Sequence, residues 1–170
     1  MPNDTAPTTR DHPITPSDTP IRQPLCPQWA GVSCPVIGMI HLRALPGSPG
    51  FAGAMADIAA SAVRDAEALH AGGVDGLMLE NFGDVPFFKG RVPAETVAAM
   101  TRAAGAVRDA VGLPLGINVL RNDGLSALAI ASAVGASYIR INVLSGAALT
   151  DQGVIEGQAA EVMRYRAALG

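Results

Sequence analysis

Lysine is nearly missing from this sequence, since Lys89 is the only one among 170 residues. A Schiff-base aldolase needs a lysine inside its active site, whereas Lys89 falls in a predicted loop, so that mechanism is not expected. The other basic residues are arginines dispersed along the chain, and the formal net charge is −3. A nucleic-acid partner is therefore not expected, because binding to phosphates needs a basic patch or stripe.

Cysteines and long apolar runs are also scarce. Cys26 and Cys34 have no second Cys or His pair at the spacing of a metal site, so no metal is predicted, and no cofactor can be named. The first residues lack the basic and apolar parts of a secretory signal. The longest apolar run, 126–139, is shorter than the roughly 20 residues that span a bilayer. We expect a cytoplasmic protein without a transmembrane segment.

Prolines concentrate at the start of the chain, where residues 1–35 hold eight of the thirteen. This stretch shows almost no periodic apolar pattern, so it cannot bury enough surface to offset the entropy lost on ordering. We predict a disordered leader over residues 1–34 and one folded domain over residues 35–170.

From Pro35 onward, short apolar runs alternate with Ala-rich stretches of helical period, which is typical of βα units in a parallel sheet. Glycines after the helical stretches predict where the helices end. Four units make either a small open sheet or half of an eight-stranded barrel, which typically needs about 250 residues. The predicted strands are 36–42, 76–81, 115–120 and 138–143, and the predicted helices are 55–71, 93–111, 123–134 and 155–169.

The alternation of side chains along the strands favours the half barrel. In the fourth strand, Ile139 and Ile141 share one face while Arg140 and Asn142 share the other. An open sheet with helices on both sides prefers apolar residues on both faces, whereas a barrel interior can turn polar where the active-site loops begin. The same alternation puts His41, Glu80 and Asn118 on the polar face. The predicted fold class is a parallel α/β fold of the TIM-barrel type, truncated to about four βα units.

Several motifs in order carry a family resemblance: Pro35-Val-Ile-Gly-Met-Ile-His-Leu, Leu45-Pro-Gly-Ser-Pro, Gly72-Gly-Val-Asp-Gly, Leu79-Glu-Asn-Phe-Gly-Asp-Val-Pro-Phe, Gly116-Ile-Asn-Val-Leu-Arg-Asn-Asp, Tyr138-Ile-Arg-Ile-Asn-Val and Asp151-Gln-Gly-Val-Ile-Glu-Gly. From about Pro35 to Leu169 the chain resembles the BtpA/SgcQ family. The resemblance implies a (β/α) barrel and, for phototroph members, an association with photosystem I biogenesis, while other members sit among sugar-metabolism proteins. It implies no settled reaction. Family members are longer, with later strands that would supply the usual phosphate site of a barrel.

Glu80 and His41 are the candidate catalytic residues, because a carboxylate and an imidazole at strand ends can move protons. We expect Glu80 to form an ion pair with Arg140, since an arginine that points inward needs a counter-charge. The alternative is a polar plug with a purely architectural role.

The candidate ligand-binding residues are Asn81, Asp84, Asn118, Arg121, Asn122, Asp123, Arg140 and Asn142. Amides bind hydroxyl groups, and arginines bind phosphates or carboxylates. For Asp123 we favour a cap on the following helix. Asn118 and Asn142 fit a ligand site and a hydrogen-bonded barrel interior equally. The histidine and carboxylates form only a loose group for a metal ion.

Three functional hypotheses follow. The leading one is a barrel that binds a small polar ligand, phosphorylated or sugar-like, at the strand ends. The second is an assembly factor for a membrane complex of the photosystem I type, which contacts proteins, peripherally at a membrane, through the apolar loop 82–88. The third is an inactive truncated product that self-associates, because unpaired strand edges are exposed.

Overall fold

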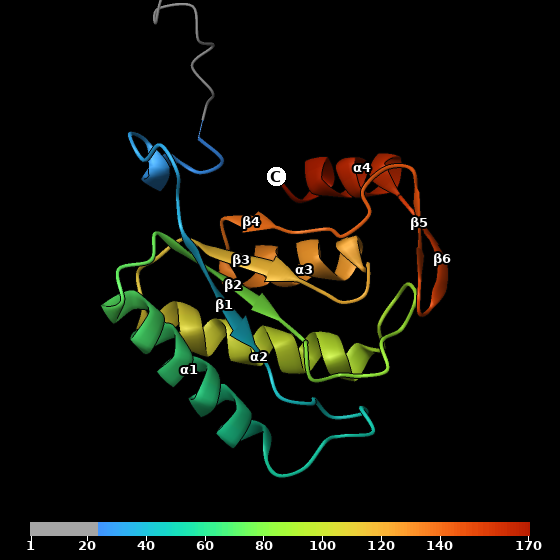
Figure 1. The fold of residues 1–170 in the computed structure, drawn as a ribbon, viewed down its shortest axis with the longest axis horizontal. Helices are drawn as coiled ribbons and strands as arrows, with labels where there is room; N and C mark the ends of the chain where they lie inside the picture. The colour runs from blue at the N-terminus through green and yellow to red at the C-terminus, as the bar shows by residue number, and fades with distance from the viewer. Residues whose placement is uncertain (1–23) are drawn as a thin grey trace, which may run out of the picture.

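The computed structural model describes residues 24–170 (Figure 1). Its main body is a parallel sheet with the order β1-β2-β3-β4, so each strand lies beside the strand before it in the chain. Helices α1, α2 and α3 lie against one face of the sheet. The elements are η2 (Pro27–Trp29), β1 (Ile37–His41), α1 (Met55–Ala71), β2 (Gly76–Glu80), α2 (Ala94–Ala110), β3 (Leu115–Asn118), α3 (Gly124–Val134), β4 (Tyr138–Ile139), β5 (Ala147–Thr150), β6 (Gly153–Glu156) and α4 (Ala159–Leu169).

The parallel α/β arrangement is confirmed for the described residues. Its sheet is open, with β1 and β4 at the edges, so this part of the chain does not close a barrel. Helix α1 has the predicted bounds because Gly72 and Gly73 follow it, and Gly73 has a φ of +82° that favours glycine. Helix α2 starts directly after Pro93.

The segment after β4 differs from the prediction. The strand expected over 138–143 is shorter, and the predicted loop and helix start are replaced by an antiparallel hairpin of β5 and β6, so α4 begins only at Ala159. The hydroxyl of Thr150 donates to the carbonyl of Gly153 and accepts from the backbone N–H of Gln152. Gly153 has a φ of +86°, which a hairpin turn accommodates. These local hydrogen bonds stabilise the turn between β5 and β6, which the helical periodicity predicted from residue 155 onward did not indicate.

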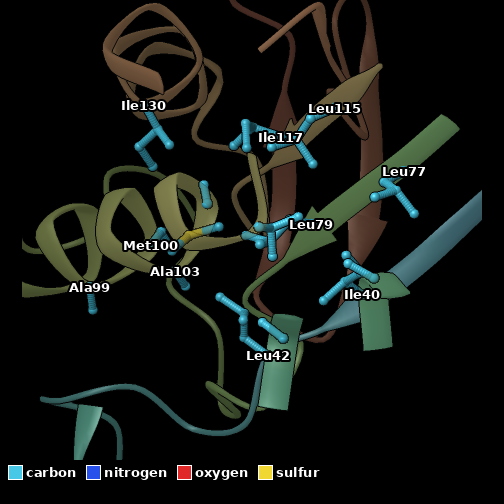
Figure 2. Packing of buried hydrophobic residues seen from close by; sticks show 14 of the residues in the cluster. Ile40, Leu42, Leu77, Leu79, Ala99, Met100, Ala103, Leu115, Ile117 and Ile130 are labelled. Carbon is cyan, nitrogen blue, oxygen red and sulfur yellow. The ribbon is translucent and has the colours of Figure 1, made fainter. Parts of the chain in front are cut away.

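The hydrophobic core lies between the sheet and helices α1 to α3 (Figure 2). Alternate strand residues Ile40, Leu79 and Ile117 are fully buried there, and Met100 and Ala103 of α2 pack in the same cluster. Burying one large aliphatic side chain contributes about 1.5–3 kcal/mol. Apolar burial therefore decides which face of the sheet meets the helices, and the polar strand residues point to the other side.

Trp29 lies in the segment predicted as leader, yet it is 4% exposed. Its indole Nε1 donates to the carbonyl of Asp75 at 2.8 Å, and its ring packs on Tyr138 with 5.3 Å between centroids. A Cβ at Gly76 would lie 2.6 Å from the Trp29 ring, so glycine is required by the close approach of that ring. Cys26 and Trp29 are therefore buried against the fold near the start of the strands. The domain boundary at residue 34 stays a prediction.

The remainder of the predicted leader, residues 1–23, lies outside the described residues. Among residues 24–170, no helix combines the length and the apolar character needed to cross a bilayer.

Candidate functional site

The carboxyl ends of the strands bring the main candidate residues side by side. In the sheet register, His41 of β1 aligns with Glu80 of β2, and Glu80 aligns with Asn118 of β3. Arg140 directly follows β4, and its backbone N–H donates to the carbonyl of Ile117. Because parallel strands all end at the same edge, four separate βα units contribute to one polar strip.

Glu80 is the centre of this strip. Its side chain is 4% exposed, and its Oε1 accepts from Nη1 of Arg140 at 2.8 Å, so the predicted ion pair is confirmed. The other carboxylate oxygen lies 3.6 Å from Nε2 of His41. Arg140 and His41 are both about half exposed, at 52% and 47%. A buried carboxylate thus anchors two solvent-facing groups that can bind a ligand or exchange protons.

His41 also stacks on an aromatic ring from the loop after β2. The rings of His41 and Phe82 lie 4.3 Å apart at an angle of 15°, and Phe82 is 51% exposed. Phe82 in turn packs at a tilt on Phe87, with centroids 6.4 Å apart. The imidazole is therefore held between a carboxylate and an aromatic face.

Asn118 and Asn142 lie next to the ion pair. The Asn118 amide donates to the carbonyl of Arg140 at 2.8 Å and to Oδ1 of Asn142 at 3.3 Å. Oδ1 of Asn118 is buried and has no hydrogen-bond partner among the described residues. A buried acceptor without a hydrogen-bond partner costs free energy. A donor from a ligand, a water or another chain would remove that cost at Oδ1 of Asn118.

Asn81 and Asp84 face the neighbouring loops instead. Asn81 pairs with the backbone of Leu120 through both its amide nitrogen and its oxygen, and its nitrogen also donates to Asp84. Asp84 accepts from the backbone N–H of Leu45 at 2.7 Å. Burial raises the pKa of Asp84, although the hydrogen bonds from Leu45 and Asn81 act in the opposite direction. These two residues tie the loops after β1, β2 and β3 together.

A cavity of about 320 Å³ adjoins these tied loops. Asn81 and Asp84 line it together with the apolar side chains of Phe87, Phe88 and Leu120. Glu80 and Arg140 are not among its lining residues. The cavity and the polar strip are therefore neighbouring features that share the loop after β2, and the charged chemistry belongs to the strip.

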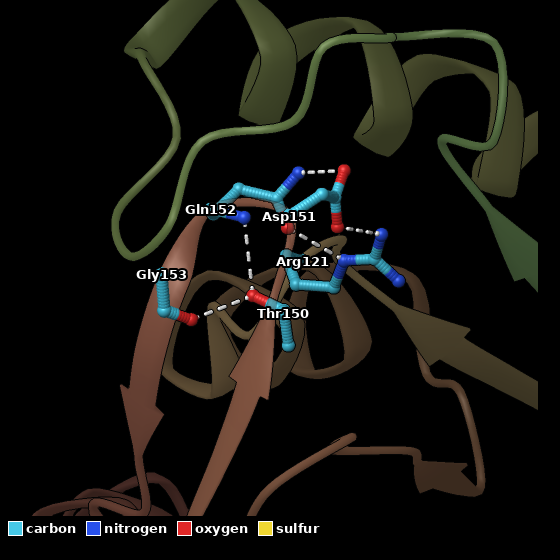
Figure 3. A network of polar contacts seen from close by, with 5 residues as sticks. All are labelled: Arg121, Thr150, Asp151, Gln152 and Gly153. Atoms are coloured by element: carbon cyan, nitrogen blue, oxygen red, sulfur yellow. Dashed lines mark hydrogen bonds and ion pairs between the residues drawn. The ribbon is translucent and has the colours of Figure 1, made fainter.

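Arg121, predicted to bind an anionic ligand, already has protein partners (Figure 3). Its Nη2 lies 2.9 Å from Oδ1 of Asp151, and its Nε donates to Oε1 of Gln152 at 3.0 Å. Its guanidinium also sits over the ring of Phe87, 5.0 Å from the centroid. Asp151 and Gln152 form the turn between β5 and β6, so the hairpin that the sequence did not reveal supplies these partners.

Asn122 and Asp123 brace the same region. Asn122 accepts from the backbone N–H of Val143 at 2.8 Å and donates to its carbonyl at 3.0 Å. Asp123 caps α3 by accepting from the backbone N–H of Ser126 at 2.9 Å, so the predicted cap is confirmed. It also accepts from the backbone N–H of Val92. Both side chains are occupied with backbone groups, and those of Val143 and Val92 belong to loops distant in the sequence.

The structure does not bring together the loose group of His41, Glu80, Asp84 and Asp123 considered for a metal ion. Within residues 24–170, no three His, Cys, Asp or Glu side chains lie close enough to hold one. Only His41 and Glu80 of that group are near each other. The donor set that remains, one carboxylate with an imidazole and a guanidinium, suits an anionic or hydroxylated organic ligand better than a cation.

Comparison of the sequence with known proteins identifies its family. The sequence profile of the BtpA family matches residues 32–170, which is most of the chain. The chain belongs to the BtpA family. Photosystem I biogenesis protein BtpA of Synechocystis sp. is 54% identical over 132 residues, which cover 78% of this chain and 46% of that protein. The predicted BtpA/SgcQ membership is thereby confirmed.

Other BtpA relatives have no stated activity. An uncharacterised protein of Pyrococcus furiosus is 50% identical over 136 residues, which cover 80% of this chain and 52% of that protein. The putative sgc region protein SgcQ of Escherichia coli is 37% identical over 142 residues, covering 82% and 52% respectively. The chain spans about half the length of these curated relatives.

Proposed function

We propose that residues 35–170 form half of a (β/α) barrel of the BtpA type, which binds a small polar ligand, phosphorylated or sugar-like, at the carboxyl ends of its strands. One observation carries this proposal: a carboxylate that is 4% exposed, on Glu80, holds a half-exposed guanidinium and a half-exposed imidazole at the open face of the sheet. Ligand sites in parallel α/β folds typically lie at this end of the strands.

The chemistry of the strip supports an anionic or hydroxylated ligand. Arg140 uses Nη1 for Glu80, which leaves the donors on Nη2 and Nε for a phosphate or carboxylate. The Asn118 amide nitrogen is occupied by Arg140 and Asn142, so Asn142 is the residue that offers N–H donors to a hydroxyl. Oδ1 of Asn118, which has no hydrogen-bond partner among the described residues, is an acceptor for a hydrogen bond from a hydroxyl. His41, oriented by the Glu80 carboxylate, is the group placed to take a proton from the ligand.

The remaining candidate residues have a supporting role in this proposal. Asn81 and Asp84 join the strand-end loops, and Asn122 and Asp123 fix the chain around α3. Residues locked by such hydrogen bonds hold the ligand-contacting groups in position. We assign binding to Arg140, Asn118 and Asn142 and proton transfer to Glu80 and His41.

The test uses the full 170-residue chain and defined probes. Thermal unfolding is followed by circular dichroism with inorganic phosphate, ribose 5-phosphate or ribose at increasing concentration. Binding to the native state raises the melting temperature, so we expect a concentration-dependent rise with at least one phosphorylated probe. Arg140→Met should raise the dissociation constant of that probe at least about tenfold, because a charge-assisted contact is lost. Arg102→Met, which changes an exposed arginine on α2, should leave the response unchanged.

Two results would count against a ligand site. One is a melting temperature that none of the probes alters. The other is a response that survives Arg140→Met and Glu80→Gln at the same probe concentration, since both changes alter the polar strip and neither touches the core.

A second candidate function, the assembly of a membrane complex through protein contact, draws on the loop after β2. Phe82, Val85 and Phe88 are 51%, 57% and 56% exposed, an unusual concentration of apolar groups on one loop. The Synechocystis relative is named for photosystem I biogenesis. In a pull-down from solubilised photosynthetic membranes, Val85→Ser with Phe88→Ser should abolish recovery of photosystem I subunits. Loss of recovery with Arg140→Met alone would point to the polar strip instead.

A further inference from the structure

The cavity of about 320 Å³ beside the tied loops has the features of a second ligand site, apart from the polar strip. Its walls come from the loop after β1, the loop after β2, the start of α2, and Leu120 just after β3. They therefore belong to the first three βα units. We call this space the loop cavity.

Hydrogen bonds to the backbone hold the walls of the loop cavity in place. The N–H of Leu45 donates to the carboxylate of Asp84 at 2.7 Å, and the carbonyl of Leu45 accepts from the N–H of Ser48 at 3.0 Å. On the loop after β2, the carbonyl of Phe88 accepts from the N–H of Arg121 at 3.2 Å. A cavity whose walls are fixed before binding loses little conformational entropy when a ligand enters.

Ring side chains make up much of the lining. Pro49, Pro86, Phe87 and Phe88 contribute ring surfaces to it. An apolar cavity of about 150 Å³ holds a benzene ring, so about 320 Å³ leaves room for an aromatic ring with a short chain. Phe88 is 56% exposed, so the loop cavity reaches the molecular surface, where a ligand can enter.

Asp84 is the only ionisable side chain that lines the loop cavity. Burial raises its pKa, so the charged form costs free energy at this position. The ion pairs formed within residues 24–170 involve the carboxylates of Glu80 and Asp151, not that of Asp84. The two Asp84 oxygens accept one hydrogen bond each, from Leu45 and Asn81, whereas a carboxylate has about four acceptor positions. This carboxylate can therefore accept further N–H donors, and a cation would offset the cost of its charge.

The other polar groups of the wall also favour a ligand that donates hydrogen bonds. Oγ of Ser48 is buried and has no hydrogen-bond partner in the part of the chain that the structure describes. The amide nitrogen of Asn81 already donates to Asp84 and to the carbonyl of Leu120. The wall thus offers more acceptors than donors, which disfavours a phosphate or a carboxylate and favours an ammonium group.

We propose that the loop cavity binds a small primary amine, whose ammonium group pairs with Asp84 and whose aromatic ring lies against Phe87 and Phe88. The face of an aromatic ring also attracts a cation. The guanidinium of Arg121 already lies over the ring of Phe87, 5.0 Å from its centroid, so Phe88 is the ring left for this contact. The amine site does not depend on the ligand proposed for the polar strip, because Glu80 and Arg140 do not line the cavity.

An amide NMR titration of the full 170-residue chain at pH 7 tests this proposal. The probes are phenethylamine, 2-phenylethanol and 3-phenylpropionate, which share a ring and a short chain but end in an ammonium, a hydroxyl and a carboxylate. We expect phenethylamine to have a dissociation constant at least about tenfold below those of the other two, since only the ammonium forms a charge-assisted hydrogen bond with Asp84. Its amide shifts should centre on Ser48 and Phe88 and leave Arg140 unchanged.

Two variants separate the charge from the ring contact. Asp84→Asn should raise the dissociation constant of phenethylamine at least about tenfold and change that of 2-phenylethanol by less than about twofold. Phe88→Ala removes part of the wall and should raise both dissociation constants by a similar factor of about three to ten. Glu95→Gln is the matched control, because it makes the same change of acid to amide on an exposed residue of α2 that does not line the cavity. It should leave both dissociation constants unchanged.

Several results would overturn the amine site. They are the absence of amide shifts up to about 10 mM phenethylamine, shifts that centre on Arg140, and equal affinity for phenethylamine and 2-phenylethanol. Unchanged binding of phenethylamine to Asp84→Asn would also overturn it. The comparison of the three probes uses the wild type alone, so it decides the question even if a variant does not fold.

Discussion

Replacing Arg140 by methionine removes the counter-charge of a carboxylate that is 4% exposed. Met keeps much of the aliphatic stem, so the change reports mainly on the charge-assisted hydrogen bond of 2.8 Å. Such bonds contribute about 1.5–3 kcal/mol when buried, and exposed ion pairs contribute about 0.2–1 kcal/mol. Because Glu80 is buried and Arg140 is 52% exposed, we expect a loss of about 1–2 kcal/mol.

A double-mutant cycle in urea isolates this interaction. The free energy of unfolding is measured at one fixed protein concentration for the wild type, Arg140→Met, Glu80→Gln and the double variant. We expect a coupling energy of about 1 kcal/mol. The pair of Arg121 and Asp151, in which Asp151 is 66% exposed, is the comparison and should couple by about 0.5 kcal/mol or less. Equal coupling in the two cycles would refute the reasoning that burial of the carboxylate sets the strength.

Three further predictions concern single side chains. Tyr138→Phe should lower the free energy of unfolding by about 1 kcal/mol near neutral pH, because the phenol donates a hydrogen bond to the carbonyl of Leu77. Burial raises the pKa of Tyr138, so the stability advantage of the wild type should be complete below about pH 10 and should fall as the pH rises further. Urea unfolding at several pH values measures this difference. Burial also raises the pKa of Asp84, so ionising this carboxyl group costs more in the folded state than in the unfolded state. The free energy of unfolding of the wild type should therefore fall relative to that of Asp84→Asn as the pH rises from about 3 through the raised pKa. Above that pKa the difference between the two proteins should stay constant. Asp123→Ala should cost about 1–2 kcal/mol by removing the cap on Ser126, and Asp123→Ser should recover part of that loss in thermal unfolding.

The βα order and the two faces of the sheet could be predicted because both depend on local periodicity. Leu79 and Ile117 alternate with Glu80 and Asn118, and the apolar set is buried against helices as expected. The partner of Arg140 could also be predicted, since an inward arginine needs a buried counter-charge and the predicted strands offer only one.

Neither the hairpin of β5 and β6 nor the burial of Trp29 could be predicted, and the reasons differ. The hairpin rests on a turn of a few residues, in which the hydroxyl of Thr150 and the positive φ of Gly153 outweigh a weak helical pattern. Trp29 stands alone in a proline-rich stretch, and one large ring can be buried without any periodicity.

For the site residues too, positions on strands could be predicted from periodicity, whereas contacts between loops could not. The sequence indicated the polar strand ends, and the ligand contacts predicted for Arg121 and Asn122 stay predictions. It could not show which side chains and backbone groups of distant loops reach these two residues. Asn122 binds both backbone groups of Val143, and Arg121 binds Asp151 of the hairpin. Contacts between loops depend on the final turn geometry, which strand and helix periodicity does not contain.

Trp29 is the sequence's only tryptophan, and it is packed between Gly76 and Tyr138 near the start of the strands, at the opposite end from Glu80. Its fluorescence is consequently an intrinsic optical reporter of one end of the molecule. Emission should shift to longer wavelength when the fold is lost and water reaches the indole. A ligand bound at the far end would leave the spectrum unchanged, so a change in emission on adding a probe would report loss of the fold near Trp29 and not occupancy of the polar strip.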